Sequence, residues 1–267
     1  MISRLTFPLA KDSGDSPLRI KTMTDESGHV KHQTAADGPC LAARLFGIIL
    51  APRNTFVTIV RCPHPWGILI AVCLSVGGAS GWLISTEVGQ QAALEQQVQA
   101  MESFGLTISD EMYTGMRRGL DNAIYFAAGG VIVWVPLLAL LIAGVVWIVC
   151  YVAFGVNAPF KAIYAVVAHV GVVNIVQQVF VVPLNYTRGA MTNPATLGVF
   201  FPMLDVNTFA QRALSLVDLF VVWQLFLLAI GVAVLYKRRT APIAATFYGL
   251  YAVTAIIGGL VLSRMGG

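Results

Sequence analysis

The chain has 267 residues, of which 57% are hydrophobic and only 11% are charged, and its formal net charge is +4. Soluble domains average roughly 45–50% apolar and about 25% charged residues. A soluble fold could not bury this much apolar surface, so the composition excludes an ordinary water-soluble enzyme and a disordered chain and indicates a polytopic membrane protein.

Residues 1–40 are polar and mixed in charge, and Gly and Ser are frequent among them. They show no apolar periodicity, which predicts a flexible cytoplasmic tail. This tail also lacks the long apolar stretch of a cleaved signal peptide. We expect residues 41–267 to form one membrane domain.

The segment Leu41–Arg61 has apolar residues at helical spacing, interrupted by Pro52. Proline suits the first turn of a new helix, so the pattern predicts two helices. Each is too short to span a bilayer. We expect a pair of amphipathic helices lying in the membrane interface, with packing against the membrane bundle as the alternative.

Five apolar runs follow, each long enough to cross roughly 30 Å of hydrocarbon at about 1.5 Å per residue. They are Trp66–Ser85, Ile124–Phe154, Ala162–Leu184, Leu214–Tyr236 and Ile243–Leu262. The second run is longer than one span needs, so it is expected to tilt, to kink at Pro136 or to project from the membrane.

The Lys and Arg residues predict how these spans are oriented. Twelve of the seventeen lie before the first span, between the second and third spans, or between the fourth and fifth spans. Such loops stay in the cytoplasm. The prediction is therefore an all-α membrane protein with five transmembrane helices, a cytoplasmic N-terminus and an extracytoplasmic C-terminus.

The loop between the fourth and fifth spans is Lys237-Arg238-Arg239. These side chains are candidates for contact with anionic lipid headgroups, worth about 1 kcal/mol per charge. Membrane orientation alone explains them equally well. Three charges are too few to indicate a nucleic-acid partner.

Between the first two spans, residues 86–123 are acidic and carry apolar residues at helical spacing. Gly105 ends the first helical pattern, and Ser109 before Asp110 and Glu111 is typical of a helix N-cap with an acidic first turn. We expect an extracytoplasmic helical hairpin, continuous with the first two spans. It is either a docking surface or a solvated pair of helix extensions. The second outer segment, residues 185–213, is expected to form turns and loops.

One carboxylate, Asp218, lies inside an apolar run, where a charge costs about 2.5 kcal/mol or more. Helical spacing places a polar face on the fourth span and another on the third, and we expect the two faces to meet. The predicted intramembrane polar cluster consists of Asp218, Ser215, Gln211, Asn174, Gln177 and Gln178. Its hydrogen bonds either hold the spans together or belong to a proton or ion pathway.

Small residues recur at close-packing intervals in two spans. Gly77 and Gly81 are four apart in the first span, and a row of small residues lines one side of the fifth. This row is Ala245, Gly249, Ala252 and Gly259. Such rows let helices approach closely, either within one chain or across the seam of a homo-oligomer.

Four short stretches follow one another along the chain: Leu45–Phe56, with its Ala-Pro-x-x-Thr-Phe ending, Pro63–Trp66, Asn193–Gly198 and Leu214–Phe220. In this order they resemble the YIP1-domain family of bacterial membrane proteins. The resemblance implies five spans, a cytoplasmic N-terminus and no catalytic residues. It also implies a place beside an ABC-type exporter, as for some bacterial relatives. The chain lacks the Asp-Leu-Tyr-Gly-Pro motif of eukaryotic relatives, so GTPase binding is not implied.

The chain has no phosphate-binding loop, no paired zinc histidines and no nucleophile elbow. We therefore expect no enzyme, no cofactor and no metal. The favoured function is an accessory or scaffold subunit of a larger complex in the bacterial inner membrane. The alternative is a small transporter or channel that uses Asp218 and the polar face of the third span.

Overall fold

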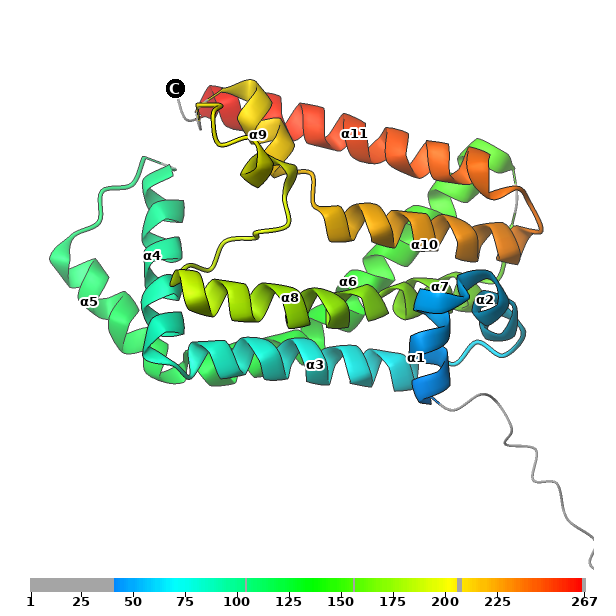
Figure 1. Ribbon diagram of the computed structural model, residues 1–267, viewed down its shortest axis with the longest axis horizontal. Coiled ribbons are helices and arrows are strands. Elements are labelled where there is room, and N and C mark those ends of the chain that lie inside the picture. The colour runs from blue at the N-terminus through cyan, green and yellow to red at the C-terminus, as the bar shows by residue number, and fades with distance from the viewer. Residues whose placement is uncertain (1–40, 104, 156, 206–207, 266–267) are drawn as a thin grey trace, which may run out of the picture. The chain divides into compact units, whose positions relative to one another are not determined.

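The computed structural model (Figure 1) describes residues 41–103, 105–155, 157–205 and 208–265. The predicted tail, residues 1–40, lies outside the described residues. The elements in chain order are α1 (Leu41–Leu50), α2 (Pro52–Arg61), α3 (Trp66–Ile84), α4 (Glu87–Ser103), α5 (Asp110–Gly119), η1 (Leu120–Asn122), α6 (Ala123–Phe154), α7 (Phe160–Val170), α8 (Val172–Arg188), η2 (Leu197–Phe200), α9 (Phe209–Ser215), α10 (Leu219–Tyr236) and α11 (Thr240–Met265).

The described residues contain five helical segments that are long and apolar enough to cross a membrane, which confirms the predicted number. They are Trp66–Ile84, Gly129–Phe154, Phe160–Arg188, Leu219–Tyr236 and Thr240–Arg264. The third segment combines α7 and α8. The fourth begins at Leu219 and not at Leu214, because the chain between α9 and α10 is not helical.

The third span is the centre of the bundle. Eight of the eleven residues of α7 are buried, including Ile163 and Val166, which are fully enclosed. By contrast, α6 and α11 expose large side chains such as Trp134 and Leu141 on α6 and Ile257 on α11. A helix that is apolar and exposed in this way is suited to contact with lipid.

The two short N-terminal helices pack against the bundle, as the alternative in the sequence analysis anticipated. Ile48, Phe56 and Ile59 are at most 1% exposed and belong to the main apolar core. The approach is close at Gly231 of α10, where a Cβ atom would lie 2.5 Å from Val166 Cγ1 and 3.1 Å from Phe56 Cε1. Their place in a membrane interface stays a prediction.

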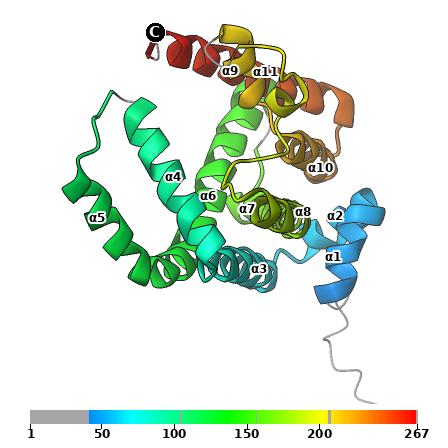
Figure 2. The same ribbon diagram turned by 60° about the vertical axis from the view of Figure 1, so that its left-hand side comes forward.

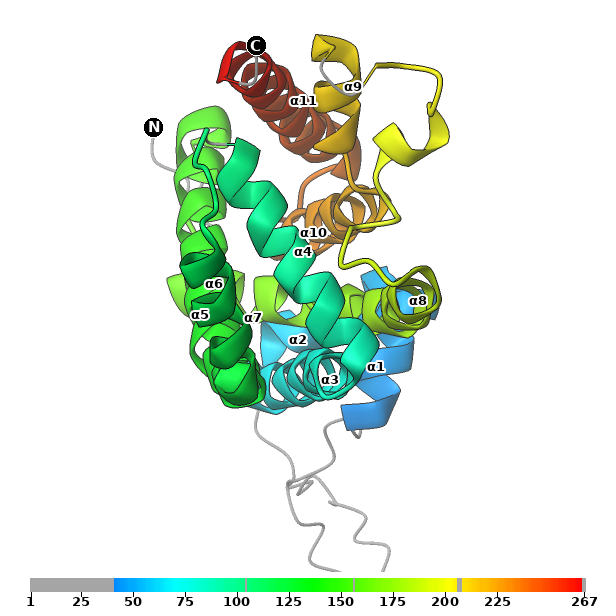
Figure 3. The ribbon, with the colours of Figure 1, turned by 90° about the vertical axis from the view of Figure 1, so that its left-hand side faces the viewer.

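The segment between the first two spans forms two helices, as predicted, but they are not continuous with α3. The chain turns at Ser85–Thr86, where the Thr86 hydroxyl accepts a hydrogen bond from Gly89 N at 3.0 Å and caps α4. Figure 3 shows α4 crossing over one end of the bundle. Gly105 has a left-handed φ of 77°, and Ser109 caps α5 by accepting from Met112 N at 3.2 Å.

The small residues of the fifth span were predicted to pack closely against another helix. Within the described chain, this prediction is wrong for three of the four residues. Ala245, Gly249 and Ala252 are exposed on α11. Only Gly259 is buried, where a Cβ atom would lie 2.8 Å from Ala213 Cβ of α9. The row follows one helical face, but within the described chain α11 uses that face for contact only near its end. Gly77 and Gly81 of α3 are buried, in agreement with close packing.

Candidate functional site

The chain breaks its helical path immediately before the fourth span. Helix α9 ends at Ser215 and α10 begins at Leu219, with Asp218 as its N-cap in an extended conformation. Asp218 Oδ1 accepts from Phe220 N at 2.6 Å and from Val221 N at 3.4 Å. The prediction of a single helical face through Gln211, Ser215 and Asp218 is therefore wrong. Aspartate is among the best N-cap residues because its carboxylate bonds amide groups that a helix start leaves unpaired.

The second carboxylate oxygen of Asp218 joins two other segments. Oδ2 accepts from Asn193 Nδ2 at 2.6 Å and from Gln177 Nε2 of α8 at 3.3 Å. Asp218 is only 8% exposed. A buried carboxylate is tolerated when donors surround it, and this one has four. The structure thus brings Asp218 and Gln177 together, as expected.

Backbone pairing fixes the loop after α8 against the break. Leu197 N donates to the Val217 carbonyl at 2.8 Å, and Leu219 N donates to the Ala195 carbonyl at 3.0 Å, which makes an isolated antiparallel bridge between Thr196 and Asp218. Non-helical backbone in a membrane requires such partners, because hydrocarbon offers none. The turn that begins at Asn193 therefore supplies hydrogen bonds that the missing helical turn cannot.

Helix α11 closes the break from the other side. Tyr251 Oη accepts from Asp218 N and donates to the Leu216 carbonyl, both at 3.0 Å. One turn away, Tyr248 Oη donates to the Val222 carbonyl at 3.0 Å. We call Asp218, Asn193, Gln177 and Tyr251 the Asp218 junction.

The remaining residues of the predicted polar cluster lie around this junction without joining it. Gln211 Nε2 donates to the Gly198 carbonyl at 3.0 Å, and Ser215 packs closely against Gly198. Asn174 Oδ1 accepts from Gln224 Nε2 of α10 at 2.9 Å. The two polar faces therefore meet at separate points: Gln177 with Asp218, and Asn174 with Gln224.

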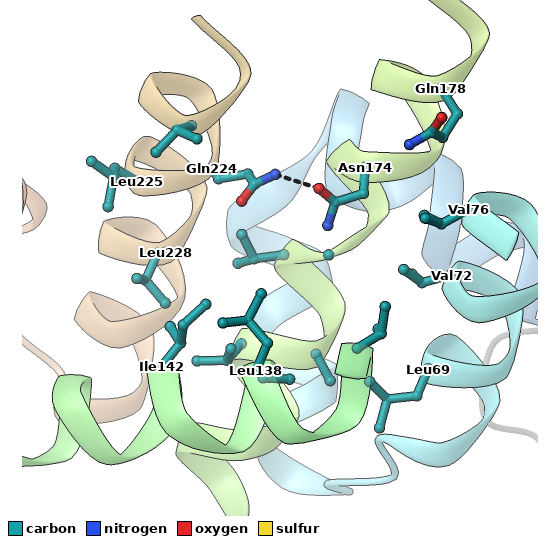
Figure 4. A pocket seen from close by; sticks show the side chains of 17 residues that line it. Leu69, Val72, Val76, Leu138, Ile142, Asn174, Gln178, Gln224, Leu225 and Leu228 are labelled. Carbon is teal, nitrogen blue, oxygen red and sulfur yellow. Dashed lines mark hydrogen bonds between the residues drawn. The ribbon is translucent and has the colours of Figure 1, made fainter. Parts of the chain in front are cut away.

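Gln178 faces a cavity of about 370 Å³ that α3, α6, α7, α8 and α10 enclose (Figure 4). Asn174 and Gln224 also line this cavity, whereas no member of the Asp218 junction does. The remaining walls are apolar. The junction and the cavity are therefore two distinct features of the bundle.

Three residues of this region are not members of the predicted polar cluster. Asn193 stood in a recognised Asn-Pro turn, but nothing local indicated that the turn folds back to Asp218. Gln224 was detectable as a third polar side chain in the fourth apolar run, after Ser215 and Asp218. Tyr251 carried a weak signal, since a tyrosine near the middle of a span needs a hydrogen-bond partner.

Metal-binding and acid–base groups are sparse in the part of the chain that the structure describes. It contains no group of three or more His, Cys, Asp or Glu side chains able to hold a metal ion. His169 is buried, with Nδ1 2.7 Å from the Ala165 carbonyl. That contact lies within the same helical turn and does not extend toward Asp218.

Lys237, Arg238 and Arg239 lie at the opposite end of α10 from the junction, and all three are exposed. Lys237 ends the helix with a positive φ of 53°, and Arg238 N donates to the Ala233 carbonyl at 2.9 Å. Their side chains are free to reach the surface at this end of the bundle. Contact with lipid headgroups stays a prediction.

The model of the Yip1 domain matches residues 46–263, within the predicted membrane domain. The chain belongs to the Yip1 domain family. It is therefore a multi-pass membrane protein of a family whose members are generally non-enzymatic. The matched region of this Yip1 protein includes the whole Asp218 junction and the cavity. Comparisons with curated proteins and with solved structures found no match.

Proposed function

We propose that this Yip1 protein is a non-enzymatic accessory or scaffold subunit of a larger complex in the bacterial inner membrane. Its partner is another membrane protein, and the bacterial resemblance favours an ABC-type exporter. The family assignment and the scarcity of acid–base groups around Asp218 support a role without catalysis.

The observation that carries this proposal is the state of α5. This helix has ten residues, and none of their side chains is buried. Helix α5 joins α6 through η1 without a gap, so α6 supports one end of it. Gly115 and Thr114 lower its helix propensity. The exposed faces of α5 are therefore available to an additional surface, which would stabilise the helix further.

One face of α5 is suited to such a surface. Helical spacing puts Met112, Tyr113 and Met116 on one side, and Met112 and Tyr113 are 41% and 37% exposed. Glu111 and Arg118 lie on the other side. An apolar stripe beside charged residues is the pattern of a helix that docks on a partner. Figure 2 shows α5 at the margin of the bundle, where a partner has access to it.

Photocross-linking in native membranes tests this proposal. A photoreactive amino acid at Met112 is expected to capture one membrane protein in high yield. The same group at Glu111, on the opposite face, is the matched control and is expected to capture little. If Met112 captured only lipid, or if both positions gave equal yields, α5 would no longer support the proposed subunit role.

A transporter or channel is the second candidate, and the break at Asp218 favours it. Discontinuous helices form the ion and substrate sites of many transporters. If Asp218 carries ions, Asp218→Asn abolishes flux in liposomes while the protein stays folded. If Asp218 is structural, Asp218→Asn leaves function intact and Asp218→Leu destabilises the bundle.

A further inference from the structure

We propose that the cavity between α3, α6, α7, α8 and α10 binds an uncharged, membrane-soluble molecule that has an aliphatic chain and a carbonyl or hydroxyl head. This inference goes beyond the subunit role and does not depend on it. It is based on the cavity's walls, its amide groups, its opening and its depth.

The walls are aliphatic and carry no charge. Fourteen of the seventeen lining residues are Leu, Val, Ile, Ala or Gly, and the other three are amides. The apolar positions include Leu69, Val72 and Val76 of α3, Leu138 and Ile142 of α6, and Leu228 of α10. Transfer of a methylene group from water to such walls is favourable by about 0.8 kcal/mol. In a membrane, however, lipid chains offer the same methylene group equally apolar surroundings. The apolar walls alone therefore do not favour a ligand over the surrounding lipid chains.

Selectivity comes from the three amides. The hydrogen bond from Gln224 to Asn174 leaves Asn174 Nδ2 and Gln224 Oε1 available. Among the described residues, the Gln178 amide forms no hydrogen bond, and Figure 4 shows it on the cavity side. In hydrocarbon, a polar group without a partner costs about 1–3 kcal/mol. A carbonyl or hydroxyl head recovers this cost, whereas an alkane does not.

The cavity wall on α6 includes exposed side chains, from which we infer that the opening faces the bilayer. Two of the lining residues, Leu138 and Ile142 of α6, are 54% and 38% exposed. Both lie in Gly129–Phe154, a segment long and apolar enough to cross a membrane, so we expect hydrocarbon around them. A ligand reaches the cavity by lateral diffusion, and an ionic one is disfavoured because no charged side chain lines the walls.

The depth of the amides excludes ordinary phospholipid heads. Asn174 is at the centre of the span Phe160–Arg188, about 20 Å from either end at 1.5 Å per residue. Phosphate and glycerol groups lie at the membrane surface. The head that meets Asn174 and Gln178 is therefore a small neutral group able to enter the hydrocarbon interior.

The test uses the full-length protein in lipid nanodiscs and two probes. One is a twelve-carbon ketone that carries a diazirine, and the other is an alkane of the same length with the same diazirine. The ketone is expected to label α3 and α6 peptides that line the cavity, saturably and in competition with the unlabelled ketone. The alkane is expected to label the exposed faces of α6 and α11 without saturation.

Three variants sharpen the result. Val72→Trp fills the cavity and is expected to abolish saturable labelling, while Leu141→Trp on the exposed face of α6 is the matched control and leaves it unchanged. Gln178→Leu keeps the volume similar and is expected to weaken competition about tenfold, the effect of one or two hydrogen bonds. Equal behaviour of ketone and alkane, or no effect of Gln178→Leu, would overturn the proposal. Because Gln178→Leu is conservative in size, the test stands even if Val72→Trp does not fold.

Discussion

At the scale of single residues, Asp218 combines two structural tasks. One oxygen caps α10, and the other holds the loop after α8 through Asn193 and the third span through Gln177. Asparagine can cap a helix and keep part of this network, whereas leucine can do neither.

We expect Asp218→Asn to lower the free energy of unfolding by about 1 kcal/mol and Asp218→Leu by about 3 kcal/mol or more, because leucine leaves buried donors unpaired. The measurement is SDS-induced unfolding in mixed micelles, followed by tryptophan fluorescence. Glu102→Leu, at an exposed position of α4, is the control and should be nearly neutral. Equal stability of the Asp218→Leu variant and the native protein would show that Asp218 does not hold these segments together.

Tyr251 offers a second, independent test of the junction. Tyr251→Phe removes the group that accepts from Asp218 N and donates to the Leu216 carbonyl, so a loss of about 2 kcal/mol is expected. Tyr248→Phe removes one hydrogen bond to a carbonyl inside α10 and should cost about half as much. The same unfolding titration measures both. A larger loss for Tyr248→Phe would show that the break contributes little.

The sequence predicted part of this junction. An aspartate in an apolar run required donors, and Gln177 was found from helical spacing alone. Asn193 and Tyr251 could not be found in this way, because their contact with Asp218 depends on a loop that folds back and on how α11 packs beside α10. Neither property is encoded in local periodicity.

At the scale of helices, glycine positions show where packing is tight. Gly231 of α10 lies where side chains of α2 and α7 press against α10. Its missing Cβ leaves room for Val166 and Phe56. Gly249 of α11 has open space around it. Both glycines lie inside apolar helices, so the sequence alone does not distinguish them.

We expect Gly231→Ala to destabilise the bundle by about 1–3 kcal/mol, since the new methyl group displaces packed side chains. Gly249→Ala should be neutral or stabilising by up to about 1 kcal/mol, since alanine is the better helix former. Unfolding titrations of both variants check the difference. If the two substitutions had the same effect, the close approach of α2, α7 and α10 would be in doubt.

Helix boundaries can be predicted from the sequence only where a local pattern sets them. Ser109 was correctly predicted as an N-cap because the Ser-Asp-Glu pattern is local. The start of α10 at Leu219 was not predicted, since apolar residues continue on both sides of Asp218. The turn at Thr86 was not predicted either, because helical spacing continues in the polar segment that follows it. Hydropathy locates membrane spans well, but it does not detect a break that polar partners from distant segments stabilise.

At the scale of the whole membrane domain, charge separates along the bundle. No acidic residue occurs in residues 41–86, in residues 122–204 or after Asp218. The α4–α5 segment is acidic, whereas α1, α2 and the turn after α10 carry only basic charges. The Lys and Arg part of this asymmetry is the physical basis of the predicted cytoplasmic N-terminus, since acidic residues contribute little to membrane orientation.

Cysteine accessibility checks that orientation. In a variant in which Cys40, Cys62, Cys73 and Cys150 are replaced by alanine, a cysteine at Arg118 of α5 should react with an impermeant maleimide in intact cells. A cysteine at Arg239 should react only after permeabilisation. The reverse pattern would place α5 in the cytoplasm and invert the topology.

We propose that this Yip1 protein belongs to a larger membrane complex and that its partner docks on α5. Extraction from native membranes in mild detergent, followed by mass spectrometry of the co-purified proteins, tests it most directly. We expect a stoichiometric membrane partner that co-purifies with the native protein and is lost in the Met112→Glu, Tyr113→Glu double variant, while Glu111→Gln keeps it. A single species from the native protein, or a partner that the double variant retains, would contradict the claim.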